Sequence, residues 1–130
     1  MNLLDENVRS DQRALLRQWR IPFRQIGREI SRLGAQDDNI LVLLHRLKRP
    51  TFFTQDEDFF KSRLCHVGYC LVWLDVSDIE VAQHIRRFLR QPEFRTHGQR
   101  LGTVVHVAVG RLRYWRVGTR HCASLNWSSV

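Results

Sequence analysis

Seven of the thirteen acidic residues of this 130-residue chain occur in three short groups. The groups are Asp5-Glu6, Asp37-Asp38 and Asp56-Glu57-Asp58. Carboxylates that converge repel one another unless a cation neutralises them, and hard oxygen ligands of this kind suit Mg²⁺ or Mn²⁺. Such an ion can orient water and stabilise the charge that develops during cleavage of a phosphodiester. The acidic groups therefore predict a metal site with catalytic potential.

Each acidic group also has a simpler structural interpretation. Asp5 ends a short apolar segment, where Asp is common in turns. Asp37 or Asp38 can cap a helix and favour its dipole, and Asp56 can cap the short helix that follows it. Glu6 and Glu57 are expected to be solvated. These alternatives remain open alongside the metal site.

The hydrophobic pattern predicts an α/β fold in which strands and helices alternate. Strands are expected over 2–4, 21–26, 51–54, 69–74, 103–109 and 112–117, and helices from residue 8, from residue 37, around 59–64 and over 78–90. Alternation of this kind predicts a mostly parallel sheet with helices on both faces, closed here by an antiparallel hairpin. Pro22 indicates an edge strand. Ligand sites of such sheets lie beyond the carboxyl ends of the strands, where all three acidic groups can meet.

Three connecting segments carry their own expectations. Gly110-Arg111 is expected to form a type II′ turn between the last two strands. Residues 92–101 are expected to form a basic loop, and residues 119–130 a polar tail anchored by Trp127.

The positive charge of the chain is unevenly distributed. The net charge is +8, and residues 81–130 contain nine Arg with Glu93 as their one acid. This asymmetry favours an anionic partner such as nucleic acid or an acidic protein. Arg-rich codon usage is an alternative explanation for the excess of Arg over Lys, and a solvated face is the alternative for each single arginine. The candidate nucleic-acid contacts are Arg86, Arg87 and Arg90 on one helix, with Arg111 and Arg113 on the last hairpin. Tyr114 and Trp115 are expected on opposite faces of their strand.

Several other classes of protein are disfavoured. Asp56-x-Asp58 lacks the Thr or Val of a phosphatase motif because Phe60 stands in its place, and no Lys follows Lys61 as a phosphoacceptor domain would need. There is no nucleotide-binding glycine motif. Three cysteines argue against a disulfide framework. The beginning of the sequence does not resemble a signal peptide, so we expect a cytoplasmic protein with no membrane partner.

Three motifs in order resemble those of short bacterial PIN-like proteins. Leu3-Leu4-Asp5-Glu6-Asn7 resembles their opening motif, and Thr54-Gln55-Asp56-Glu57-Asp58-Phe59 resembles their T-x-D-x-D-F motif. Between the two, the segment from Gly34 to Ile40 is similar to the glycine and aspartate that open a helix in that family. Its spacing favours Asp37 over Asp38. The resemblance extends to the terminal hairpin and covers residues 2–117.

The resemblance implies a PIN-like three-layer α/β/α domain over residues 1–118, followed by the C-terminal tail. The family is related to VapC-type toxin ribonucleases. A metal-dependent endoribonuclease of a toxin–antitoxin pair is therefore implied, with RNA as substrate, Mg or Mn as cofactor and a small antitoxin protein as inhibitor. Its catalytic and metal-binding residues would be Asp5, Asp37, Asp56 and Asp58.

Two alternatives to the enzyme remain. One is a catalytically inactive PIN-like protein that binds nucleic acid or an acidic protein through its basic C-terminal half. The other is an oligomerising interaction module, for which a homodimer is the simplest form. The sequence does not fix a fourth acidic position downstream, for which Asp75 and Asp78 are candidates.

Overall fold

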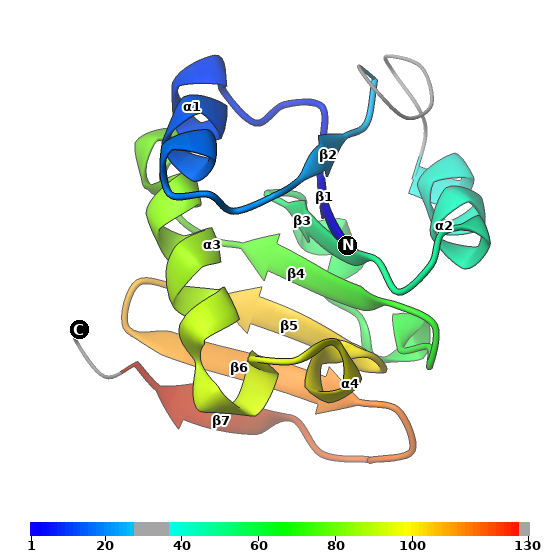
Figure 1. Cartoon of the computed structure of the whole chain (residues 1–130). Coiled ribbons are helices and arrows are strands. Elements are labelled where there is room, and N and C mark those ends of the chain that lie inside the picture. Colours follow the sequence, from blue (N-terminus) through cyan, green and yellow to red (C-terminus); the bar gives the residue numbers. More distant parts are fainter. Residues whose placement is uncertain (28–36, 128–130) are drawn as a thin grey trace.

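The computed structural model describes residues 1–27 and 37–127, and it describes the side chains of the second range from residue 39. Within these residues seven strands form one mixed sheet in the order β2-β1-β3-β4-β5-β6-β7 (Figure 1). The strands are β1 (Asn2–Leu4), β2 (Arg24–Gln25), β3 (Thr51–Thr54), β4 (Cys70–Leu74), β5 (Thr103–Val107), β6 (Arg111–Arg116) and β7 (Ala123–Asn126). The fold is therefore α/β, as the sequence predicts.

The first five strands are parallel, and the last two are antiparallel to their neighbours. The chain first runs outward from β1 to the edge strand β2, and then returns to the other side of β1 to add β3, β4 and β5. The strand order therefore reverses between β1 and β3, which is where sheets of this kind hold ligands.

Alternating side chains of the central strands bury two separate cores. Leu4, Phe53, Val72 and Val105 belong to one cluster, here called the α1–α3 core after helices α1 (Ser10–Gln18) and α3 (Val81–Arg90). Their immediate neighbours Leu3, Phe52, Leu71 and Val104 belong to the other, here called the α2 core after helix α2 (Asp37–Arg46). Apolar residues on both faces of a parallel strand require cover on both sides.

Helices supply that cover on both faces of the sheet. Helices α1 (Ser10–Gln18) and α3 (Val81–Arg90) lie side by side on one face, and α2 (Asp37–Arg46) covers part of the other (Figure 1). Short 3₁₀ turns η1 (Glu57–Phe59) and η2 (Ser62–Leu64) follow β3, where one short helix was expected. Among the described residues, no helix has both the length and the apolar character needed to cross a membrane.

Helix α3 forms because its apolar residues repeat along one side. Val81, Ile85 and Phe88 are buried on that side, and Phe88 packs edge-on against Phe53 of β3 with ring centroids 5.9 Å apart. The helix follows the 3₁₀ turn η3 (Asp78–Glu80), so the predicted helix over 78–90 has a different first turn. The buried Gln12 of α1 accepts a hydrogen bond from the Ala82 N–H at 2.9 Å, and this bond ties the two helices together.

The hairpin turn differs from the prediction by one residue. The Ala108 N–H bonds to the Arg111 carbonyl at 2.9 Å, so the turn residues are Val109 and Gly110. Gly110 has no positive φ, so the type II′ prediction is wrong. The register follows the buried Leu112, which must face the α1–α3 core.

Two segments predicted as irregular contain regular structure. In the expected basic loop, η4 (Pro92–Phe94) precedes a short helix α4 (His97–Arg100), which Thr96 and Gln99 close with a capping box. In the expected tail, β7 pairs with β6 and adds a strand to the sheet. Trp127 is an anchor as predicted, since its Nε1–H donates to the Ala108 carbonyl at 2.6 Å.

We expect Phe88→Ala to lower the free energy of unfolding by about 3–5 kcal/mol, because it leaves a cavity between the sheet and α3. Urea denaturation at neutral pH would measure the loss. Ile79→Ala is the control, since Ile79 is 63% exposed and its truncation should change stability little. Equal effects of the two substitutions would contradict the packing described here.

Candidate active site at the carboxyl edge of the sheet

Asp5 is held at the end of β1 by groups of the neighbouring strand. Its N–H donates to the Phe53 carbonyl at 3.0 Å, which continues the pairing of β1 with β3 by one residue. Its carboxylate accepts the buried Thr54 hydroxyl on Oδ2 at 2.6 Å and the Glu6 N–H on Oδ1 at 2.8 Å. The position of the carboxylate is therefore fixed, and each oxygen retains a lone pair.

The surroundings of Asp5 oppose its negative charge. Burial raises the pKa of this carboxyl above its usual 3.8, and the nearby charges of Glu6 and Asp56 raise it further. The hydrogen bonds from Thr54 and from the Glu6 N–H act in the opposite direction. A cation beside a carboxylate in such an environment stabilises its charged form.

Asp56 joins Asp5 from the other side of the point where the strand order reverses. Its N–H donates to the Thr54 hydroxyl oxygen at 3.1 Å, so Thr54 is linked to both acids. Its Oδ1 accepts the Asp58 N–H at 2.9 Å and caps η1. The capping interpretation of Asp56 is therefore confirmed.

Two hollows meet at Gln55 and Asp56. One, of about 390 Å³, is lined by acidic side chains from three connections, and the full lining is Asp5, Glu6, Asn7, Val8, Ile40, Gln55, Asp56 and Asp78. The other, of about 490 Å³, is lined by Gln55, Asp56, Glu57, Trp73, Leu74, Asp75 and Val76. Gln55 braces the boundary, because its Nε2 donates to the Val76 carbonyl at 3.1 Å and to Asp78 Oδ1 at 3.0 Å.

The structure brings together only some of the predicted acids. Asp5 and Asp56 share the first hollow, whereas Asp58 is exposed and lines neither. Asp37 begins α2, and its side chain lies outside the described residues. Ile40, three residues further along α2, lines the first hollow, so the start of this helix is close to it. Asp78, one of two candidates in the sequence for a fourth acidic position, lines the first hollow. Its position shortly after the predicted strand β4 is the feature of the sequence that indicates it.

The chemistry of these donors suits a divalent cation, while their spacing is looser than a closed site requires. All the acids of the first hollow offer hard oxygen ligands. Among residues with described side chains, however, no group of three or more His, Cys, Asp or Glu residues could hold a metal ion. The described residues thus provide part of a ligand set.

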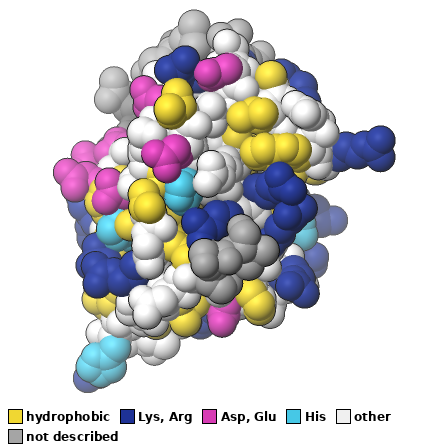
Figure 2. Space-filling model, turned by 90° about the vertical axis from the view of Figure 1, so that its left-hand side faces the viewer, with side chains coloured by type: hydrophobic (Ala, Val, Ile, Leu, Met, Phe, Trp, Pro, Cys, Tyr) yellow, Lys and Arg dark blue, Asp and Glu magenta, His cyan; other side chains and the backbone are white. Residues whose placement is uncertain are grey.

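The candidate arginines lie on two sides of the sheet. Arg86 and Arg87 of α3 pack over Trp19 and Trp127, each with its guanidinium carbon 4.6 Å from the ring centroid. Figure 2 views the α1–α3 side, on which acidic side chains gather toward the left and Lys and Arg side chains lie mainly below and to the right. Arg111 and Arg113 lie on the other face of the sheet from Arg86 and Arg87. They share a face of β6 with Trp115, which packs on the α2 core. Tyr114 packs on the α1–α3 core, so the predicted opposition of Tyr114 and Trp115 is confirmed.

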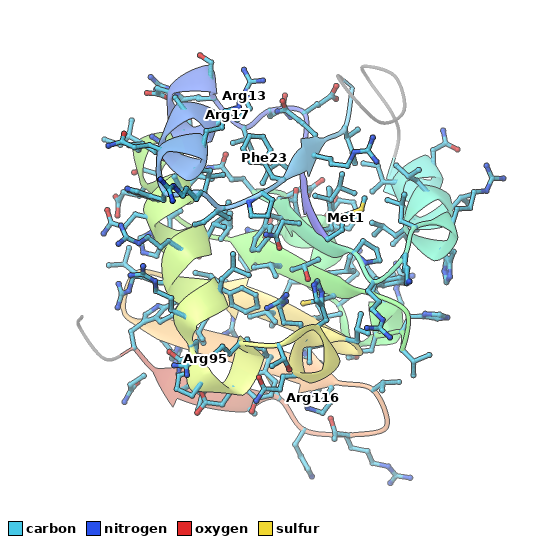
Figure 3. The ribbon with its side chains drawn as sticks, in the orientation of Figure 1. Met1, Arg13, Arg17, Phe23, Arg95 and Arg116 are labelled. Carbon is cyan, nitrogen blue, oxygen red and sulfur yellow. The ribbon has the colours of Figure 1, made fainter. Side chains whose placement is uncertain are left out.

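A third hollow, of about 350 Å³, is basic. It is lined by Arg17, Arg20, Ile21, Pro22 and Phe23. The Arg17 guanidinium lies over the Phe23 ring at 5.1 Å, and Figure 3 shows Arg13 and Arg17 on α1 above Phe23. With no acid in its lining, this hollow has no part in a metal site.

Comparison with known proteins adds no assignment. No family model matches the chain, and neither a curated protein nor a solved structure is similar to it. The function of the chain is therefore inferred from the geometry of the site and from the motifs.

We expect the carboxyl of Asp5 to titrate above 3.8 and its pKa to rise further in Thr54→Val, which removes a hydrogen bond to the carboxylate. Carboxyl ¹³C NMR without divalent ions would measure both values. Since folded Asp5 binds its proton more tightly than unfolded Asp5, its contribution makes the free energy of unfolding fall as pH rises from 3.8 through the folded pKa.

Thr119→Val is the control for this titration, because Thr119 is exposed and its hydroxyl donates to the Arg116 carbonyl. An unchanged pKa of Asp5 in Thr54→Val would contradict the role assigned to the hydroxyl.

Proposed function

We propose that the chain is a metal-dependent ribonuclease of PIN-like type, which cleaves RNA phosphodiester bonds with Mg or Mn at the carboxyl edge of the sheet. The observation that carries the proposal is the meeting of Asp5 and Asp56. They follow two different strands and line one hollow where the strand order reverses, and the charge of Asp56 adds to the effect of burial in raising the pKa of Asp5. The toxin role, with a small antitoxin as inhibitor, is part of the same proposal.

The arrangement of elements supports a PIN-like three-layer α/β/α domain. Five parallel strands carry α1 and α3 on one face and α2 on the other, and the antiparallel strands β6 and β7 extend the sheet beyond β5. The Asp5 and Asp56 motifs both follow neighbouring strands of this sheet. An enzyme that binds its substrate at this edge would take catalytic residues from the two segments that follow β1 and β3.

In the proposed mechanism Asp5 is the fixed ligand, since Thr54 and the Glu6 N–H hold both of its oxygens. Asp56 would contribute Oδ2, and Asp37, at the start of α2, is the further ligand that the motifs imply, whereas Asp58 lies outside the hollow. When bound, a divalent ion neutralises the carboxylates and stabilises the charge that develops on the phosphate. Arg111 and Arg113 lie on the side of the sheet from which a phosphate chain could approach the second hollow.

The second candidate function is an inactive PIN-like protein that binds nucleic acid or an acidic partner through its basic half. The excess of positive charge over residues 81–130 is the observation that favours this alternative. It shares Arg111 and Arg113 with the enzyme and differs only in needing no ion.

We expect the purified protein to cut a labelled single-stranded RNA in the presence of Mn²⁺, and to lose about 100-fold or more of that rate in Asp5→Asn and in Asp56→Asn, because the charge that the ion needs is removed. Asp11→Asn is the matched control. Asp11 is an exposed acid of α1 that pairs with Arg9, and removal of its charge should leave the rate of cleavage unchanged.

Binding without any shortening of the RNA would favour the inactive protein. Cleavage that survives both substitutions would exclude the proposed site, since the two acids would then have no part in the reaction.

A further inference from the structure

Three side chains form a row across β4, β5 and β6 that leads away from the acidic hollows. Trp73 lies opposite His106 in the strand pairing, and His106 lies opposite Arg113. All three lie on the side of the sheet that carries the α2 core, because Leu71 and Trp115 of that core are two residues away along β4 and β6.

Hydrogen bonds link this row to a carboxylate. Arg113 donates to Nδ1 of His106 from Nε at 3.1 Å and from Nη2 at 2.8 Å, and His106 Nε2 lies 3.0 Å from Asp75 Oδ2. A guanidinium can only donate, so Nδ1 is the acceptor and the proton of a neutral imidazole is on Nε2, where it is donated to Asp75. Burial and the Arg113 charge lower the pKa of His106, while Asp75 acts against them, which agrees with a neutral ring.

Aromatic rings hold the row in place. The Trp73 ring stacks on the His106 ring with centroids 4.0 Å apart, and Phe60 lies over the Arg113 guanidinium at 5.2 Å. His106 itself is only 6% exposed. These contacts leave the Arg113 side chain little freedom to move, which lowers the entropy lost when it binds a ligand.

The row begins at the wall of the second hollow. Trp73 and Asp75 line that hollow together with Asp56, and Arg113 lies one side chain beyond His106. Arg113 is half-buried, and its Nη1 makes no hydrogen bond to any residue that the structure describes. An oriented guanidinium with one free edge is suited to a phosphate oxygen.

We infer that Asp75 and His106 are positioning residues, which hold Arg113 as a contact for a phosphate of a nucleic-acid strand beside the acidic hollows. The inference rests on the proposed function for its ligand, an RNA strand. It adds to that function a residue, His106, and a direction of approach over β5 and β6. Arg111 lies on the same side of the same strand and has no histidine partner, so it serves as the internal comparison.

The test is a double-mutant cycle on binding, measured in EDTA so that no cleavage intervenes. Labelled single-stranded RNA is the probe, with pyrophosphate as a second probe that carries only phosphate charge. We expect Arg113→Ala to weaken RNA binding about 10-fold and to reduce the salt dependence by about one phosphate contact. His106→Gln should reproduce most of this loss alone and add almost nothing in the Arg113→Ala background.

Asp75 supplies a variant pair that avoids the buried histidine. Its side chain is 54% exposed, so both variants should fold. Asp75→Asn keeps an oxygen that accepts the His106 proton, whereas Asp75→Ala does not, and the two remove the same charge. We expect Asp75→Ala to bind the RNA more weakly than Asp75→Asn does. In the Arg113→Ala background the two variants should bind it equally.

Each outcome separates this inference from the ribonuclease proposal. The losses from His106→Gln and Arg111→Ala should be additive, since these residues are not partners. If the losses from His106→Gln and Arg113→Ala are also additive, the positioning role is overturned, while cleavage of RNA by the wild type is unaffected by this result. Coupled losses without Mn²⁺-dependent cleavage support the positioning role and overturn the enzyme. A wild-type protein that binds neither probe overturns both.

Discussion

The parallel pairing of β1 with β3 is the constraint on which the site depends. It places the Asp5 N–H on the Phe53 carbonyl and thereby brings the Thr54 hydroxyl within 2.6 Å of the Asp5 carboxylate. The same hydroxyl accepts the Asp56 N–H, so one buried threonine joins two acids that are far apart in the sequence. Burial raises the pKa of Asp5 and the nearby charge of Asp56 raises it further, so a cation beside the two carboxylates would stabilise their charged forms.

The arginines of the C-terminal half lie on both sides of the sheet and in different surroundings. On α3, Arg86 and Arg87 cover tryptophan rings and thereby extend the α1–α3 core to the surface. On β6, Arg113 is held by His106 near the acidic hollows, while Arg111 is exposed. The positive charge of this half is therefore not one continuous surface, and only the part on the α2 side adjoins the proposed site.

Hydrophobic periodicity is sufficient to predict the central strands. It is not sufficient for the last strand and the hairpin turn, whose positions depend on pairing and burial contributed by other segments. The apolar run that ends at Leu74 predicted β4 because both of its faces are buried. The last strand was missed because Ser124 and Asn126 obscure the alternation of Ala123, Leu125 and Trp127, which only the pairing with β6 makes visible. The hairpin turn was misplaced because its register is set by the burial of Leu112 and not by the glycine beside it.

The sequence by itself determined the α/β class, the mostly parallel direction of the strands and the acids that follow β1 and β3, because these depend on patterns within short segments. The tertiary structure decided that Asp5 and Asp56 share a hollow with Asp78, that Asp58 lies outside it, and that His106 connects Asp75 to Arg113. Such groupings follow from strand order and register, which bring distant residues together through pairings that no single segment specifies.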